Sequence, residues 1–225
     1  MPFAEGIHMH AIDRVKQVLK DPQTVTRVRK YYANDLNYSG FLFTQLPELD
    51  RFSITATDLF AASTLSIKFE AVAAKRLIVE SSIASEISRL LRLVPEISIQ
   101  DASDEDFEKM SEFYLYVKNQ LSKPDTKNPN RWVAASKLVT RKRPNLFPVR
   151  DNLVINYLGI KNSRNHLDDW GIYRSIMQDE EIRDGIKSLA LELQSSDIDE
   201  SSIMREPELR LLDVALWSSA KAAGR

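Results

Sequence analysis

A proline turn that leads into an aspartate is the part of this sequence whose residue types could do chemistry. Phe147, Pro148, Val149 and Arg150 precede Asp151, and an apolar run that we expect to be helical follows. Proline restricts the backbone that enters the turn, and the start of a helix favours a negative charge. Asp151 is therefore predicted to be an ionised carboxylate, and its place inside the most basic part of the chain suits an anionic ligand such as DNA.

The surroundings of Asp151 form the most basic part of the chain. Between residues 123 and 164 there are ten basic residues and two acidic ones, although the whole chain has a formal net charge of -1. A concentrated basic segment can bind phosphate locally, and the solvated faces of ordinary helices would explain the same charges. The residues expected to contact DNA phosphates are Lys127, Arg131, Lys137, Arg141, Lys142, Arg143 and Arg150.

Composition excludes several kinds of site and protein. The chain has no cysteine, which excludes disulfides and thiolate sites and favours a cytoplasmic protein. His8 and His10 have no acid nearby, and His166 with Asp168 and Asp169 is interpreted as a surface loop, so neither a metal nor a cofactor is expected. No apolar run is long enough to span a membrane.

Helical patterns dominate the chain and predict an all-α fold. Apolar residues from Phe107 to Leu121 recur at three- and four-residue steps, as on the buried face of a helix. Thr55 and Ser103 each stand three residues before an aspartate, which is a capping pattern. We expect one compact domain, or two helical lobes of about residues 1–98 and 99–225 with a cleft between them.

Residues 107–158 carry a resemblance to a known family. They are expected to run as helix, polar hairpin, helix, proline turn and aspartate, with small residues at 133–135 and the run FPVRDNLV at 147–154. This order resembles the helix-hairpin-helix superfamily of DNA glycosylases. The resemblance implies a helix-hairpin-helix-like element within a two-lobed helical bundle, and a catalytic role for Asp151.

Two departures from that family affect the expected activity. The hairpin from Ser122 to Asn130 has no glycine, although asparagine can adopt the left-handed backbone that glycine would supply. Arg131 and Trp132 stand where bifunctional relatives carry a lysine. Neither side chain can form a Schiff base, so the resemblance implies a monofunctional enzyme that leaves the abasic site intact.

The resemblance also implies a mechanism and a binding partner. DNA would be the partner, and a damaged or modified base would be flipped out and released, in repair or in defence against foreign DNA. Asp151 would stabilise the sugar cation and activate water. The base pocket requires flat aromatic or amide side chains, and the candidates are Tyr31, Tyr32, Asn34, Tyr38, Phe41 and Trp170.

Two other functions stay open at the level of sequence. An aspartate after a proline turn is commonly a helix N-cap, so the chain can equally be a non-catalytic helical protein that binds nucleic acid. It can also be a protein-interaction module whose basic segment meets an acidic partner. Through residues 137–144 and the run LDVALW at 212–217, the sequence also resembles an uncharacterised group of helical bacterial proteins, which carries no function.

Overall fold

The structure is all-α, as the sequence predicts. This computed structural model describes residues 2–33, 39–122, 131–161, 165–194 and 206–224, and the side chains of residues 2–7 lie outside the description. Across these ranges the regular structure is helical, with no strand. No helix in the described part of the chain is long and apolar enough to cross a membrane.

The chain forms two compact units rather than lobes separated near residue 98. One comprises Met1–Tyr38, Ser98–Asp101 and Arg150–Arg225, and the other comprises Ser39–Ile97 and Ala102–Val149. Each unit is assembled from segments that are separate in the sequence, so a single boundary cannot divide them. We name them the α13 unit and the α8 unit, after the most buried helix of each.

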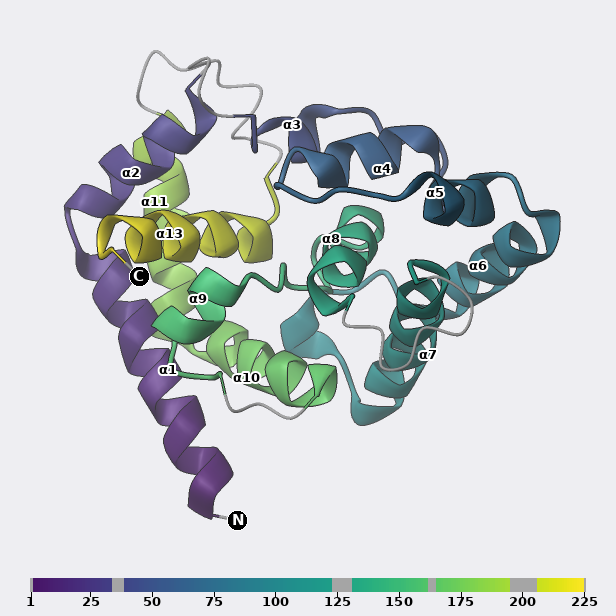
Figure 1. Ribbon diagram of the computed structural model, residues 1–225. Helices are drawn as coiled ribbons and strands as arrows, with labels where there is room; N and C mark the ends of the chain where they lie inside the picture. The colour runs from purple at the N-terminus through teal and green to yellow at the C-terminus, as the bar shows by residue number, and fades with distance from the viewer. Residues whose placement is uncertain (1, 34–38, 123–130, 162–164, 195–205, 225) are drawn as a thin grey trace. The chain divides into compact units, whose positions relative to one another are not determined.

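In the α13 unit, one C-terminal helix lies at the centre. The helices described here are α1 (Pro2–Lys20), α2 (Gln23–Tyr32), η1 (Ile99–Asp101), α9 (Asn152–Tyr157), α10 (His166–Gln178), α11 (Glu180–Gln194) and α13 (Glu208–Ala222). Helix α13 packs against α1, α2, α9 and α11, and Figure 1 shows it in yellow between α2 and α9. Its residues 209–216 are all buried, so it forms the core of this unit.

In the α8 unit, α8 takes the equivalent central place. The helices are α3 (Leu42–Gln45), α4 (Ala56–Ser63), α5 (Ala71–Ile78), α6 (Ser81–Leu93), α7 (Asp104–Gln120) and α8 (Trp132–Lys142). Helix α8 packs against α4 and α7, which flank it in Figure 1. Residues 135–143, the basic run included, are all buried.

Local sequence signals explain where two helices of the α8 unit begin. At α4 the Thr55 hydroxyl accepts the Asp58 N–H, and the Asp58 carboxylate accepts the Thr55 N–H. Ser103 and Asp106 make the same reciprocal pair at α7. Each cap satisfies backbone donors that the helix leaves unpaired, and contributes about 1 kcal/mol to stability. The two predicted capping patterns are confirmed.

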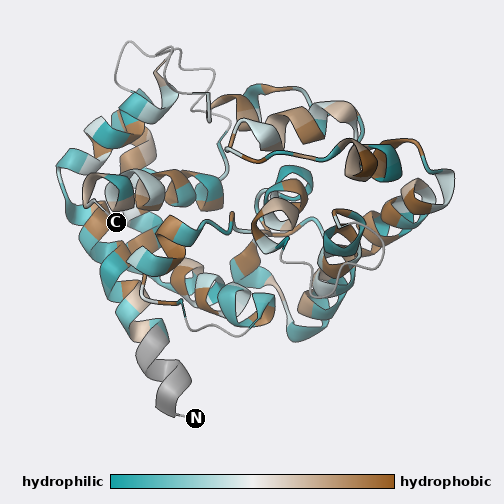
Figure 2. Cartoon of the chain, viewed as in Figure 1, coloured by the Kyte–Doolittle hydropathy of each residue, from teal (hydrophilic) through white to brown (hydrophobic). Residues whose placement is uncertain are grey.

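Both central helices bury charged side chains. Figure 2 shows hydrophilic and hydrophobic residues mixed on α8 and on α13. Lys142 on α8 is 2% exposed, and Arg210 and Asp213 on α13 are 4% and 3% exposed. A buried charge costs several kcal/mol unless it is paired and hydrogen-bonded. The groups that pair with these buried charges therefore indicate the role of each helix.

Candidate functional site

Asp151, the predicted catalytic residue, begins α9 and is half-buried. Its Oδ1 accepts a hydrogen bond from the Leu153 N–H at 2.9 Å, which is the geometry of a helix N-cap. The same carboxylate also acts electrostatically on the phenol of Tyr173. Asp151 therefore caps α9, and its charge also acts on the buried phenol of Tyr173.

Tyr173 lies on α10 and is 1% exposed. Burial raises the pKa of Tyr173 well above its usual value, and the negative charges of Asp213 and Asp151 raise it further. A phenol in this state keeps its proton at neutral pH, so Tyr173 can act there as a neutral hydrogen-bond donor.

Arg150 is tied to the same place by an ion pair with Asp169 of α10, a residue that is 4% exposed. This pair neutralises a buried carboxylate and anchors the residue that precedes Asp151. The Arg150 guanidinium is thereby engaged within its own unit, and its contact with a DNA phosphate stays a prediction. We call Arg150, Asp151, Asp169, Tyr173 and Asp213 the Tyr173 cluster.

One face of α10 supplies much of this site. His166, Asp169, Trp170 and Tyr173 are three or four residues apart, and such residues share a helix face. His166 is 7% exposed and its ring centroid is 4.8 Å from that of Trp170. The surface-loop interpretation of His166 and Asp169 is therefore wrong. Their helical spacing, continued to Tyr173, was the signal that the sequence offered.

Asp213 of α13 joins the Tyr173 cluster to a second buried group. Its charge acts on Tyr173 and also on Tyr31 and Arg210. The Arg210 guanidinium donates to the Tyr31 hydroxyl at 2.5 Å and lies 3.8 Å from the Glu206 carboxylate. Helix α13 thus places an arginine and an aspartate, three residues apart, among buried phenols.

The aromatic residues predicted to hold a base do not form one pocket. Tyr31, Tyr32 and Trp170 are 3–5% exposed, and the Tyr32 hydroxyl donates to Glu206 at 2.6 Å. Core packing covers these rings, so the expectation that they stack on a base is corrected for this conformation. Phe41 lies in the other unit, at the N-cap position of α3. Asn34 and Tyr38 lie outside the described residues.

In the α8 unit, Lys142 shows how the basic run is used. Its ammonium group is fully buried and lies 2.7 Å from the Glu48 carboxylate and 3.3 Å from the Asp58 carboxylate. It also donates to the Asp50 carbonyl at 2.5 Å. Asp58 is itself fully buried, so this cation is held in the interior by carboxylates and a carbonyl.

The neighbouring cations bind backbone carbonyls in the same way. Arg141 donates to the carbonyls of Phe43 and Leu46, and its Nε lies 3.4 Å from Asp58. Arg143 donates to the carbonyls of Arg51 and Leu91, at 3.1 and 2.8 Å. Lys137 Nζ donates to the Leu65 carbonyl at 2.7 Å. We call Lys137, Arg141, Lys142 and Arg143 the α8 cations.

The α8 cations require a correction of the predicted phosphate surface. All four are buried, and their donors point to residues of their own unit. A phosphate would have to displace these partners before reaching the ammonium or guanidinium groups. In the described conformation these side chains fasten connecting segments of the α8 unit onto its central helix.

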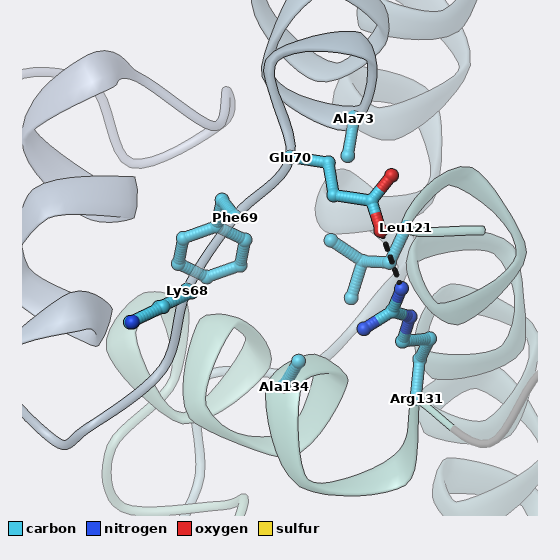
Figure 3. Close-up of a pocket in the computed structure, with 7 residues that line it drawn as sticks. All are labelled: Lys68, Phe69, Glu70, Ala73, Leu121, Arg131 and Ala134. Atoms are coloured by element: carbon cyan, nitrogen blue, oxygen red, sulfur yellow. Dashed lines mark hydrogen bonds and ion pairs between the residues drawn. The ribbon is translucent and has the colours of Figure 1, made fainter. Parts of the chain in front are cut away.

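Arg131 is the predicted phosphate contact that borders a pocket. Its guanidinium lies 2.9 Å from the Glu70 carboxylate, and both line a hollow with Lys68, Phe69 and three apolar residues (Figure 3). The hollow has a cavity volume of about 10 Å³, far below the ~300–1,000 Å³ of usual ligand pockets. Lys127 lies outside the described residues.

The Tyr173 cluster is rich in carboxylates but is not arranged as a metal site. Within the residues that the structure describes, no group of three or more His, Asp or Glu side chains converges as metal ligands do. What the cluster offers is a half-buried carboxylate beside a protonated phenol and a buried second carboxylate. Such perturbed groups gather preferentially at functional sites, although structural ion-pair networks share the feature.

Comparison with known proteins places the chain in a family. Residues 24–220 match the family described as "Family of unknown function (DUF6308)". The chain belongs to this family. No curated protein matches the chain, and no solved structure matches it either. The match includes Asp151, the whole of α8 and residues 208–220 of α13.

Proposed function

We propose that the protein is a monofunctional DNA N-glycosylase that releases a damaged or modified base, with Asp151 as its catalytic carboxylate. One observation carries the proposal: Asp151 holds a half-buried carboxylate at the N-cap of α9, and its negative charge adds to the effects of burial and of Asp213 in raising the pKa of Tyr173. Negative charge fixed in a partly desolvated place stabilises a cation that develops on a sugar. The resemblance of residues 147–154 to helix-hairpin-helix glycosylases supports the same assignment.

In this mechanism the bond between the sugar carbon and the base nitrogen breaks, and its electrons leave with the base. Asp151 stabilises the resulting sugar cation. Water then adds to the sugar carbon and gives its proton to the Asp151 carboxylate, while the released base takes a proton from solvent. The chemistry requires no cofactor. A cytoplasmic location, which the cysteine-free sequence favours, belongs to the proposal.

The residues that we propose to contact phosphate differ from those that the sequence predicts. The α8 cations are left out, because they are buried on carbonyls and carboxylates. Phosphate contact falls instead to Lys68 and Arg131, which border the hollow near the start of α8 (Figure 3). Glu70 pairs with Arg131 and competes with phosphate, so Glu70→Gln is expected to tighten DNA binding at low salt.

Base release is the decisive measurement. DNA panels carrying uracil, alkylated, oxidised and hypermodified bases, including glucosylated ones, are incubated with wild type and Asp151→Asn, and abasic sites are scored after hot alkali. Asparagine caps a helix as well as aspartate does, so folding is preserved. We expect release by wild type and a loss of about 10²–10³-fold in the variant, the usual effect of removing one charge-stabilising group.

Control variants separate catalysis from stability. Asp184→Asn alters an aspartate whose side chain is 78% exposed and should leave release unchanged. Asp151→Ala removes the cap as well, so it should also lower the free energy of unfolding by about 1 kcal/mol. Release that persists in Asp151→Asn would contradict the proposed role of this carboxylate.

A second candidate is a non-catalytic helical protein that binds nucleic acid. The observation that favours it is the hydrogen bond from the Leu153 N–H to Asp151, which is a complete role for an N-cap. No release on any panel, together with salt-sensitive DNA binding, would establish this candidate. Neither release nor salt-sensitive binding would favour a protein-interaction module.

A further inference from the structure

We propose that Arg51 and Arg92, whose guanidinium groups lie over the ring of Phe52, bind phosphates of the DNA backbone. The choice of DNA as the partner rests on the proposed function. The contact is separate from the hollow beside Arg131, and it can be tested without base release.

Three arginines of the α8 unit converge on one aromatic ring. The guanidinium carbon of Arg92 lies 4.2 Å from the centroid of the Phe52 ring. Those of Arg51 and Arg143 each lie 5.7 Å from it. A cation within about 6 Å of a ring centroid is attracted to the ring face. The connection before α4, the last turn of α6 and the end of α8 therefore meet at this ring.

Arg143 has a structural role at the ring. It is buried, and its two terminal nitrogens donate to the carbonyls of Arg51, Lys142 and Leu91. A ligand from solvent would have to displace these carbonyls. Because Leu91 belongs to the end of α6, Arg143 also satisfies part of the helix end next to Arg92.

Arg51 and Arg92 differ from Arg143 because they are exposed. Arg51, whose side chain is 54% exposed, pairs with Glu96, whose side chain is 45% exposed. Arg92 is exposed as well, and within the described part of the chain no hydrogen bond or ion pair holds its guanidinium group. Packing on the ring restricts Arg92, so less side-chain entropy is lost when it binds a ligand. We call Arg51, Phe52, Arg92 and Glu96 the Phe52 surface.

Positive charge exceeds negative charge around this ring. The carboxylates that act on the three guanidinium groups are Glu48, Asp50 and Glu96. Of these, Glu48 also lies 2.7 Å from the buried ammonium group of Lys142, and Glu96 is shared between Arg51 and Arg143. Like charges repel, so an anion bound from solvent would stabilise the three neighbouring cations.

Phosphate is the anion that this surface suits best. A guanidinium group donates from a planar fork that matches the oxygens of a phosphate. The DNA backbone carries one negative charge per about 1.7 Å of duplex axis, so neighbouring phosphates can reach two exposed arginines. The Phe52 surface lies at the end of α8, and the hollow with Arg131 lies at its start. Contacts at both places would fix how the backbone lies on the α8 unit.

The salt dependence of DNA binding measures the proposed contact. Each phosphate that a basic residue neutralises adds about 0.9 to the slope of log K against the logarithm of the salt concentration. For a short duplex without modified bases, Arg92→Gln should lower the slope by about 1 and the affinity by about fivefold at low salt. A slope equal to that of wild type would overturn the inference.

Arg89→Gln is the matched control. Arg89 lies three residues earlier on α6, and its side chain is 50% exposed and pairs with Glu86 and Glu112. The substitution removes the same charge from the same helix, so an effect of net charge alone would be equal in the two variants. We expect Arg89→Gln to keep the wild-type slope. Equal losses in Arg89→Gln and Arg92→Gln would also overturn the inference.

Glu96→Gln tests the surface in the opposite direction. It removes the carboxylate that holds Arg51, so the affinity for the duplex should rise about threefold and the slope should steepen. A folding defect cannot produce such a gain. Glu105→Gln removes the same charge from α7, at a side chain that is 75% exposed, and should leave the slope unchanged. A fall in affinity in Glu96→Gln, or an equal rise in both variants, would contradict the role of Arg51.

Phe52→Leu tests whether the ring orders Arg92. Every charge stays, so the slope should keep its wild-type value, while the affinity should fall about two- to fivefold with the loss of the cation–π contact. An affinity equal to that of wild type would contradict the role of the ring.

Nitrogen-15 NMR at the Arg92 Nε–H distinguishes the source of the phosphate. The duplex should shift this resonance more than inorganic phosphate does at the same phosphate concentration. A response to inorganic phosphate alone would overturn DNA as the partner. Base release with an unchanged slope in Arg92→Gln would refute this contact and leave the glycosylase standing. No release, with the expected change of slope, would refute the glycosylase and leave the contact standing.

Discussion

The central helices α8 and α13 bury charges in two different ways. The α8 cations bind backbone carbonyls and the carboxylates of Asp58 and Glu48. On α13, Arg210 and Asp213 meet phenols and other ionisable groups. Most partners of the α8 cations are carbonyls, which cannot gain or lose a proton near neutral pH, whereas the phenols and carboxylates around α13 can change their hydrogen bonding with their protonation.

The contrast shows that a basic run in a sequence does not identify a phosphate site. Arg141, Lys142 and Arg143 resemble an anion-binding patch, yet they hold the connection before α4 and the end of α6 in place. The α13 unit has no three consecutive cations in its sequence, but its helices α10 and α13 bury ionisable side chains such as Asp169, Tyr173 and Asp213. In this protein the chemistry is expected where titratable groups meet.

The largest loss of stability that separates the two helices should come from Asp58→Asn on the α8 side. This change removes the carboxylate shared by two buried cations, Arg141 and Lys142. Breaking a buried pair in this way costs about 3–5 kcal/mol of the free energy of unfolding. Urea unfolding measures the loss, and Glu48→Gln, whose parent carboxylate is 36% exposed, serves as control. A loss as small as that of the control would contradict a structural role for the α8 cations.

A smaller loss is expected for Arg210→Met. Glu206, whose side chain is 1% exposed, then loses its cation but keeps the hydrogen bond from Tyr32. We expect a loss of about 2–3 kcal/mol near pH 7. Urea unfolding measures this loss beside that of Asp58→Asn. A loss larger than that of Asp58→Asn would reverse the expected order of the two helices.

The smallest effect is expected at an ion pair on the surface of the α13 unit. Hydrogen bonds from Lys16 and Lys20 lower the pKa of Glu181 from 4.5 to about 2. A lowered folded-state pKa stabilises the protein above the unfolded value and loses that effect as pH falls toward 2. The Tm of Glu181→Gln should therefore lie slightly below that of wild type at pH 6, with the difference narrowing toward pH 3. A constant difference would contradict this linkage.

Sequence patterns predict the local part of this fold well. The caps at Thr55 and Ser103 and the apolar face of α7 depend on residues three or four apart, and the structure has them. The burial of the α8 cations depends on carbonyls far away in the chain, such as those of Phe43 and Leu91. Side-chain type alone favours exposure for lysine and arginine, so no local pattern could show their burial.

The candidate site likewise has a part that the local sequence predicts and a part that it does not. Asp151 at the start of a helix follows from the proline turn, and the structure has it there. Asp213 lies 62 positions later in the numbering and on another helix, and nothing near it in the sequence links it to Asp151. The sequence could have indicated that Tyr173 shares a helix face with His166 and Asp169, because it continues their spacing along α10.

The interleaved connection of the two units has a consequence for synthesis on the ribosome. The α8 unit is complete once residue 149 has emerged, apart from the excursion of Ser98–Asp101 into the other unit. Helices α1 and α2 are made before α13, which packs against them. Domains generally fold as units in the order of their synthesis. The nascent chain therefore carries α1 and α2 without this packing partner until α13 has been translated.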